Sequence, residues 1–437
     1  MKTTTYSDSY TRCTRRIEDM AKKSELQTSS ARYTCPFCFS SVDLRDIHYQ
    51  CTNPACTKIF LRELDEKSSR KYRSRNADEE IDIENTIFLG KDPAGPSPVT
   101  TKYHIVRNSS GMCDICKKSV YKRLCPSCHN PIPQGAEEEG STVFVLLGPK
   151  GVGKSHYIAV LINQLRNSFS QEFGATMSPA TDRTTMKYRD MYYKRLYEEG
   201  RKLAPTLSFE ESRESREPMI YYLRFLEKDS PRVYTLAFFD TAGEDLDSTN
   251  KMMGLNLNSF ISRASGIVFL VDPLQIPYIN TRIRMDNKPP TGGNVANMLS
   301  NIANIIRTNN TLKMKDSIPI PLAVVLTKTD VLMKAPENDE ESNILFGPSS
   351  SLNIEREKGK YDKTNCEQIS VEIEEYMRRA ISKEFVQTVK EFSEHSYFAV
   401  SALGSNPTGN VLTRGISPMR VEDPFIWLRE SLEEKKG

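Results

Sequence analysis

The chain has 437 residues, which is too long for one ordinary hydrophobic core, and its 38% hydrophobic and 27% charged residues are typical of a folded soluble protein. Its formal net charge of +3 predicts no strong general attraction to nucleic acid or to an acidic membrane surface. No apolar run approaches the roughly 20 residues that span a bilayer, and the N-terminus lacks a secretory signal, so we expect a cytoplasmic protein without a membrane span.

The cysteines are unevenly distributed along the chain. Nine of the ten precede residue 130, and in a reducing cytosol such clustering favours thiolate metal sites over disulfides. Eight of them form closely spaced pairs: Cys35 with Cys38, Cys51 with Cys56, Cys113 with Cys116, and Cys125 with Cys128. Two such turns that face each other supply the four sulfurs of a tetrahedral zinc site. We therefore predict two structural zinc ions, each held by four thiolates.

Taken in chain order, these pairs predict two zinc ribbons ahead of the main domain. Residues 1–30 are expected to form a flexible tail, 31–60 the first ribbon, 61–110 a charged and Pro-rich connection, and 111–135 the second ribbon. Two alternatives remain: one quartet has lost metal binding, or the pairs combine across the two sets into one shared site.

Two histidines and two cysteines near or outside these pairs carry no predicted role. His48 and His129 lie close to the cysteines, but four cysteines already complete each site, so both are expected to be ordinary surface residues. Cys13 and Cys366 have no partner at ligand spacing and are expected to be free thiols.

From residue 141 onward, apolar runs alternate with helical patterns. Runs this apolar suit strands that are buried on both faces of a sheet and covered by helices. The predicted strands are 142–148, 219–226, 232–240, 266–272, 320–328 and 396–402. The predicted helices are 154–168, 292–308, 368–393 and 424–435. The fold class is therefore α/β, with a doubly wound, mostly parallel sheet.

The stretch "GPKGVGKS", residues 148–155, follows the first strand and opens the first helix, which is the context in which a phosphate-binding loop is credible. Its backbone N–H groups would cradle the β-phosphate of a nucleotide, Lys154 would neutralise the β and γ oxygens, and Ser155 would ligate magnesium. The predicted binding residues here are Gly148, Lys150, Gly151, Val152, Gly153, Lys154, Ser155 and His156.

The stretch "AFFDTAGED" ends a later strand. It places Asp240 where a water-mediated magnesium contact is needed, and Gly243 where a backbone N–H can meet the γ-phosphate.

Two further strand ends predict which base is bound. "VVLTKTD" provides Thr327, Lys328 and Asp330, and a carboxylate there can accept both hydrogen bonds from the N1 and amine edge of guanine, whereas adenine offers no such pair of donors. Lys328 would lie along the base plane. "SALG", residues 401–404, ends the last strand, where the N–H of Ala402, between Ser401 and Leu403, is predicted to bind the guanine carbonyl oxygen.

In this order, the four motifs resemble those of Ras-like, TRAFAC-class P-loop GTPases over residues 141–437. The resemblance implies GTP and GDP as ligands, with magnesium held by Ser155, Asp240 and a switch threonine. Thr184 is favoured for that role, with Thr185 next. The catalytic set would be Lys154, Thr184, Gly243 and Glu244.

Three departures from the Ras pattern bear on mechanism. "TKTD" replaces the commoner N-K-x-D, so Thr327 lacks the amide that ties this loop to the phosphate loop, and we expect weaker guanine affinity with selectivity retained. Glu244 replaces the glutamine that orients the attacking water, which predicts slow hydrolysis or a catalytic group from another chain. Lys150 stands where Ras has glycine; it either points to solvent or serves as a cation in cis, and it would obstruct an arginine finger.

Insertions are expected at 186–218, 273–291 and 333–365. The first half of 186–218 is predicted to be an amphipathic helix whose tyrosines serve packing. This elaboration is similar to that of bacterial double-GTPase families, which are associated with multi-protein conflict or defence systems. Trp427 is predicted to pack against the sheet.

The favoured function is a GTP-hydrolysing molecular switch whose zinc ribbons dock a protein partner. Two alternatives are a zinc-dependent nucleic-acid-binding protein gated by its GTPase domain, and a GTP-binding scaffold without turnover. The sequence leaves oligomerisation open.

Overall fold

The computed structural model describes residues 32–56, 104–107, 110–132, 142–204, 218–226, 232–238, 257–283, 285, 288–291, 295–332, 345, 347 and 349–435. Within these ranges no helix is both long enough and apolar enough to cross a membrane. The predicted tail and most of the predicted connection at 61–110 lie outside the described residues.

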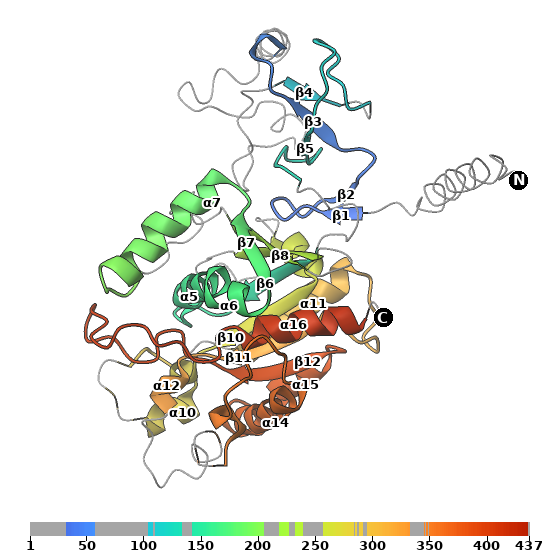
Figure 1. Cartoon of the computed structure of the whole chain (residues 1–437). Coiled ribbons are helices and arrows are strands. Elements are labelled where there is room, and N and C mark those ends of the chain that lie inside the picture. The colour runs from blue at the N-terminus through green and yellow to red at the C-terminus, as the bar shows by residue number, and fades with distance from the viewer. Residues whose placement is uncertain are drawn as a thin grey trace, which may run out of the picture.

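A sheet of seven strands is the centre of the larger domain, and its order in the described residues is β12-β11-β10-β6-β9-β8-β7 (Figure 1). Its strands are β6 (Val143–Leu147), β7 (Ala175–Pro179), β8 (Met219–Phe225), β9 (Arg232–Phe238), β10 (Gly266–Val271), β11 (Leu322–Leu326) and β12 (His395–Ala399). The pairs among β12, β11, β10, β6 and β9 are parallel, whereas β8 is antiparallel to both β9 and β7. This arrangement confirms the predicted α/β class.

Successive residues of the central strands pack into two different cores, as expected for a sheet buried on both faces. Val143, Val145 and Leu147 face one core, and Phe144 and Leu146 face the other. The first core is covered by α9 (Leu257–Ser262), α11 (Val295–Asn309), α14 (Lys363–Ala380) and α15 (Lys383–Lys390). The second is covered by α5 (Lys154–Arg166), α16 (Asp423–Glu434) and the π-helical η1 (Tyr188–Glu198). The sheet is therefore doubly wound.

One predicted helix is two helices in the structure. The prediction at 368–393 is divided between α14 and α15, because the Ser382 side chain accepts a hydrogen bond from the Phe385 N–H and so caps a new helix. α16 matches its prediction. Trp427 packs against the sheet, as expected, with its ring centroid 5.9 Å from that of Phe398 in β12. Short helices α6 (Ser168–Glu172), η4 (Pro273–Gln275), α10 (Pro277–Arg282), α12 (Thr329–Leu332) and η5 (Ser351–Asn353) complete the described domain.

The segment after α6 contains a strand that the sequence did not predict and a helix that it did. β7 forms the antiparallel edge of the sheet. α7 (Asp182–Lys187) follows and continues as the π-helical η1 (Tyr188–Glu198), which matches the predicted helix and buries Tyr188 and Tyr192. Gly200, with a φ of 61°, ends it in the left-handed conformation typical of a helix C-terminus.

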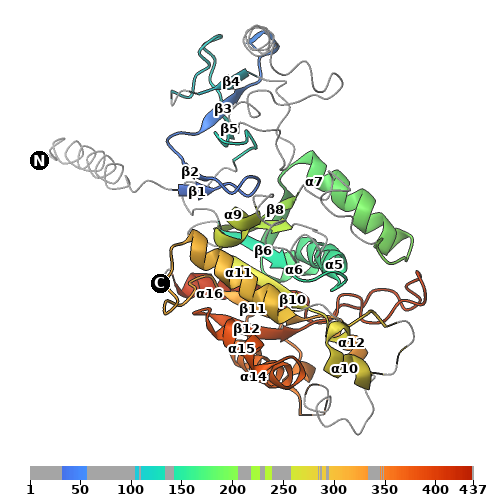
Figure 2. The same cartoon turned by 180° about the vertical axis from the view of Figure 1, so that it is seen from behind.

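The cysteine-rich residues form one module and not two successive ribbons. β1 (Arg32–Thr34) pairs with β2 (Ser41–Asp43), and β3 (His48–Cys51) pairs with both β4 (His104–Val106) and β5 (Lys122–Leu124). Strands from before and after the connection therefore share one sheet, and the predicted ribbons at 31–60 and 111–135 are wrong as separate units. Figures 1 and 2 show β1 and β2 between this sheet and the larger domain, close to α9 and β8.

Candidate functional site

The predicted phosphate-binding loop joins β6 to α5, as expected. Gly148 approaches β10 so closely that a Cβ there would lie 2.9 Å from the carbonyl oxygen of Leu270, so only glycine fits. Gly153 adopts a left-handed φ of 93° at the start of α5. The Lys154 side chain is 6% exposed, and its Nζ donates to the carbonyl oxygens of Gly148 and Pro149 at 2.6 and 3.1 Å. The loop thus holds the Lys154 ammonium with two of its own backbone carbonyl oxygens.

Thr327 ties the base-recognition loop to the phosphate-binding loop, contrary to the expectation that this tie is lost. Its Oγ1 lies 2.9 Å from the carbonyl oxygen of Val152 and 3.1 Å from that of Val271, and can donate to either. The threonine side chain is short, but it is only 4% exposed directly after β11 and lies close enough to bond both the loop after β6 and the end of β10. The structural reason given for weaker guanine binding is therefore removed.

Lys328 is held by a buried carboxylate that the sequence did not indicate. Its Nζ donates to Asp272 Oδ2 at 2.6 Å and to the carbonyl oxygen of Gly151 at 2.9 Å. Asp272 follows β10, is fully buried, and also accepts from the Leu274 N–H at 2.9 Å. Lys328 itself has a φ of 51°, a conformation that non-glycine residues adopt at some energetic cost. The ion pair fixes the lysine between two loops.

A cavity of about 330 Å³ opens at the carboxyl ends of β6, β11 and β12. Asp330 lines it, and its Oδ1 accepts a hydrogen bond of 2.6 Å from the Ser401 hydroxyl. The predicted residues that it brings together are Gly151, Val152, Gly153, His156, Thr327, Lys328, Asp330, Ser401, Ala402 and Leu403. Ligand sites in parallel α/β sheets lie at this edge of the sheet, so the position of the cavity supports the interpretation of these motifs as a nucleotide-binding site.

The other predicted residues do not line this cavity, and three of them fall outside the described part of the chain. Thr184 is 2% exposed; its hydroxyl lies 3.2 Å from Thr181 Oγ1 and accepts from the Ile220 N–H at 3.4 Å, so it is enclosed beside β8. Lys150 is exposed at the outer turn of the loop. Asp240, Gly243 and Glu244 fall outside the described residues.

His156 and Lys202 line the cavity, and Lys202 was missed because it lies 46 residues beyond the histidine in the insertion. The His156 Nε2 accepts a hydrogen bond of 3.1 Å from the Leu203 N–H, so the ring is held by the insertion. Burial, with the positive charges of Lys328 and Lys202, lowers the pKa of His156 to about 4. The imidazole is therefore neutral near pH 7, with its proton on Nδ1.

Comparison with known proteins identifies the family. The family model described as Double-GTPase 2 matches residues 143–416, from the first strand of the sheet to beyond the "SALG" loop. The chain belongs to the Double-GTPase 2 family. The cysteine-rich module of this Double-GTPase 2 protein precedes the matched range.

The chain is also similar to individual known proteins. A Mycolicibacterium smegmatis protein with the provisional name ESX-1 scaffolding and assembly protein SaeC is 29% identical over 317 residues, which are 70% of this chain and 78% of the relative. A chain of the signal recognition particle receptor complex from Chaetomium thermophilum is 13% identical, with 61% of this chain and 93% of that chain covered and a TM-score of 0.28. The Ski7 GTPase-like domain of S. cerevisiae, bound to GTP, is 15% identical over 67% of this chain and 50% of its own, with a TM-score of 0.29. Because these scores are low, the sheet order and the family match carry the fold assignment.

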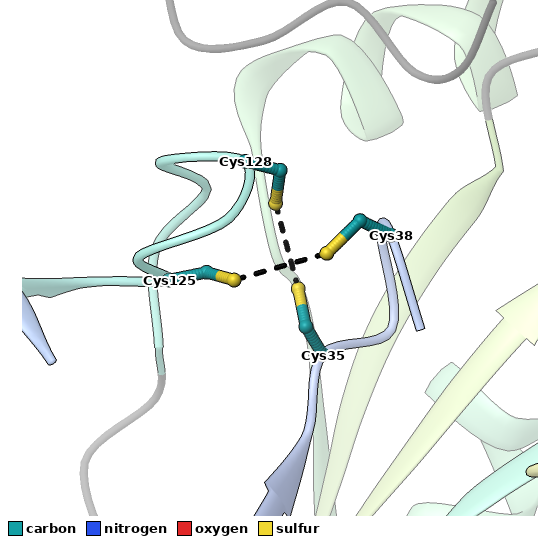
Figure 3. Close-up of side chains that lie close together, drawn as sticks. All are labelled: Cys35, Cys38, Cys125 and Cys128. Carbon is teal, nitrogen blue, oxygen red and sulfur yellow. Dashed lines mark hydrogen bonds between the residues drawn. The ribbon is translucent and has the colours of Figure 1, made fainter. Parts of the chain in front are cut away.

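The eight paired cysteines of this Double-GTPase 2 protein form two quartets, each with one pair from before the connection and one from after it. The proximal site, next to the larger domain, consists of Cys35, Cys38, Cys125 and Cys128 (Figure 3). The distal site consists of Cys51, Cys56, Cys113 and Cys116. The predicted quartets of neighbouring pairs were therefore wrong, although all eight residues were identified.

The spacing of the sulfurs fits zinc. The closest sulfurs are 3.6 and 3.8 Å apart in the proximal site and 3.8 and 3.9 Å apart in the distal site. A tetrahedron with zinc–sulfur bonds of about 2.3 Å has sulfurs about 3.8 Å apart. Burial raises the pKa of the Cys35 and Cys128 thiols well above their ordinary value, so these two would be held as thiolates only beside a cation.

Three of the four cysteine pairs share one turn geometry. The residue after the second cysteine is Phe39, Lys117 or His129, each with a φ of 56°. Its N–H donates to the carbonyl oxygen of the first cysteine of its pair at 2.7, 3.0 and 2.8 Å, respectively. The repeated turn aims both sulfurs of each pair to one side. His129, which was expected at the surface, is 1% exposed, and its ring centroid lies 5.6 Å from that of His48.

The proximal site is packed into the core of the larger domain. Phe39 packs edge-on against Phe260 of α9, with ring centroids 4.8 Å apart. The Arg263 guanidinium, directly after α9, donates to the Phe39 carbonyl oxygen. Tyr33 and Cys35 belong to the same buried core as α9 and α11. The turn that carries two zinc ligands is thus also a contact surface for α9.

Proposed function

We propose that this protein is a guanine-nucleotide switch that binds GTP with magnesium, hydrolyses it slowly, and passes its nucleotide state to the zinc module and a protein partner. The observation that carries the proposal is the cavity in which Asp330, steadied by Ser401, meets the glycines of the phosphate-binding loop. No other site in the described residues combines a phosphate loop with a carboxylate placed for a base.

Asp330 supplies the selectivity for guanine. Its carboxylate accepts from two adjacent donors, N1–H and the exocyclic amine, which guanine has and adenine lacks. The Ser401 hydroxyl binds Oδ1 at 2.6 Å and so restricts rotation of the carboxylate. Thr327 and Lys328 hold this loop against the phosphate loop through Val152 and Gly151. Base and phosphates would therefore be bound by one connected set of loops.

Ser155, Thr184 and Asp240 would hold magnesium, which neutralises phosphate charge in such sites. Thr184 would have to leave its contacts with Thr181 and the Ile220 N–H to reach a metal beside Ser155. Such a movement is what makes a switch threonine sensitive to the γ-phosphate. Glu244 lacks the amide donor of glutamine, which supports slow turnover without a partner.

The proximal cysteine site is placed to receive the nucleotide signal. Residues 239–256, which contain Asp240 and Gly243, lie between β9 and α9 in the chain. α9 in turn carries Phe260, which contacts Phe39 of the proximal site. The distal site takes Cys51 from β3, and Figure 1 shows β3 and β4 farther from the larger domain than β1 and β2, so we place the partner on that part of the module. The assembly role in the name of the M. smegmatis relative supports a protein partner within a multi-protein system.

The substitution Asp330→Asn tests the proposed function. We expect GTP affinity to fall by about a hundredfold or more, because two hydrogen bonds to a charged acceptor are lost, and xanthosine triphosphate to bind instead. Both affinities are measured by isothermal titration with magnesium. Asp190→Asn, an exposed carboxylate on η1, is the matched control and should bind GTP normally. Unchanged GTP affinity in Asp330→Asn would refute the base assignment.

One observation favours a second function, nucleic-acid binding. Residues 107–123 contain five basic residues and one acidic residue, and Tyr121 among them is 80% exposed. Basic side chains beside an exposed ring suit a single-stranded nucleic acid. This function predicts retention of RNA or DNA that weakens steeply with salt and is lost in Tyr121→Ala; no retention at low salt would exclude it.

A further inference from the structure

A short strap, residues 199–204, crosses from the end of η1 to the nucleotide cavity. Its backbone is fixed to the loop that follows "SALG": the Lys202 N–H donates to the Asn410 carbonyl oxygen at 2.9 Å, and the Leu412 N–H donates to the Gly200 carbonyl oxygen at 2.8 Å. The Arg195 Nε also donates to the Lys202 carbonyl oxygen at 2.7 Å. Three hydrogen bonds therefore set the position of Lys202.

The strap is also joined to the first turn of α5, directly after the phosphate-binding loop. Leu203 is 6% exposed, and its N–H donates to His156 one residue beyond Ser155. Because this bond occupies Nε2, the imidazole presents its Nδ1–H as a donor. The strap thus bridges the two loops that would hold the base and the phosphates.

The Lys202 side chain lines the cavity and brings a positive charge to it. That charge acts on His156, because Lys202 and Lys328 both lower the pKa of the imidazole. Lys328 is neutralised by Asp272 at 2.6 Å, whereas no carboxylate of the described residues lies within ion-pair distance of Lys202. The cavity therefore contains one ammonium whose charge is not balanced by a described protein group.

We propose that Lys202 binds the α-phosphate of GTP and GDP. This inference rests on the proposed function. The α-phosphate lies between the base, which Asp330 would hold, and the β-phosphate, which the loop ending at Ser155 would hold. The strap runs from its anchor at Asn410 to the cavity and brings Lys202 to the space between these two groups. The strap meets His156, one residue past the end of the phosphate-binding loop, and Lys202 lines the same cavity as Asp330, whereas no described residue of β9 lines it. An ammonium at this place stabilises the phosphate whether or not the γ-phosphate is present.

The test compares Lys202→Gln with Arg201→Gln, its exposed neighbour with the same charge, and with Lys202→Arg. Affinities for GDP and for a non-hydrolysable GTP analogue are measured by isothermal titration with magnesium. We expect Lys202→Gln to weaken both ligands about tenfold, the loss of one charge-assisted hydrogen bond, with Lys202→Arg retaining most of the affinity.

The outcomes separate this inference from the proposed function. Equal losses for both nucleotides in Lys202→Gln, with normal binding in Arg201→Gln, support the α-phosphate assignment. The assignment is overturned by normal binding in Lys202→Gln, by a loss confined to the GTP analogue, or by an equal loss in Arg201→Gln. In each of these cases, wild-type binding and the effect of Asp330→Asn still support the guanine site. If the wild type binds neither guanine nucleotide, both proposals fail.

Discussion

The proximal and distal cysteine sites have the same four ligands and nearly the same sulfur spacing, but they are embedded differently. The proximal cysteines share one continuous core with α9, α11 and the central sheet. The distal cysteines have only a small core of their own, in which Val106 and Val120 are the other buried residues described. The two sites therefore have different expected roles: the first is part of the GTPase domain, and the second shapes a surface.

This difference shows that ligand chemistry alone does not determine what a structural metal does. A metal in a small isolated core stabilises only its own loop, because little buried surface depends on it. A metal held by the turn that packs on Phe260 would stabilise both that turn and α9. The comparison can be tested by removing equivalent residues from the two sites.

The largest difference is expected between Cys125→Ser and Cys113→Ser, which replace equally buried ligands of the proximal and distal sites. Each should lower the zinc content from about two ions per chain to about one. Cys125→Ser should also lower the free energy of unfolding of the GTPase domain by at least about 3 kcal/mol, because a ligand in its core is lost. Trp427, the single tryptophan, lies in α16 and reports that unfolding by its fluorescence.

Cys113→Ser is the control, and it should leave the Trp427 transition within about 0.5 kcal/mol of the wild type. Equal destabilisation by both variants would remove the distinction between the sites. Zinc content near zero in the wild type would refute both metal sites.

A smaller effect is expected from Phe39→Ala, which keeps all eight cysteines and removes the ring that packs on Phe260. We expect a loss of about 3 kcal/mol in the Trp427 transition, the usual consequence of truncating a buried phenylalanine, with zinc content unchanged. Tyr121→Ala is the control: it truncates an aromatic side chain that is 80% exposed near the distal site. It should change the free energy of the Trp427 transition by less than about 0.5 kcal/mol. A stable Phe39→Ala protein would show that the proximal contact does not support α9.

The sequence predicted the parallel strands well because their signal is local. Five consecutive buried residues in β6 and in β11 can be recognised without knowing their neighbours. β7 was missed because only Ala175 of its five residues is buried, so an edge strand of this kind has no hydrophobic pattern. The break between α14 and α15 depends on one serine cap inside an otherwise continuous helical pattern.

The site was predictable wherever a motif fixed the local geometry. The phosphate loop, Asp330 and the "SALG" loop meet at one cavity, as their positions after parallel strands imply. The pairing of the cysteines was not predictable, because every pair offers the same chemistry and only the tertiary fold selects partners. Asp272 and Lys202 were missed for the same reason, since their contacts join segments that are far apart in the sequence.

We propose that the nucleotide state reaches the proximal cysteine site through α9. Hydrogen exchange of the zinc-loaded protein, bound first to GDP and then to a non-hydrolysable GTP analogue, tests it most directly. We predict slower amide exchange with the GTP analogue in residues 257–263 and 35–40, because α9 follows Gly243, the proposed γ-phosphate contact, in the chain, and no change in residues 113–118 of the distal site. Identical exchange of α9 and the proximal turn in the two bound states would contradict the account.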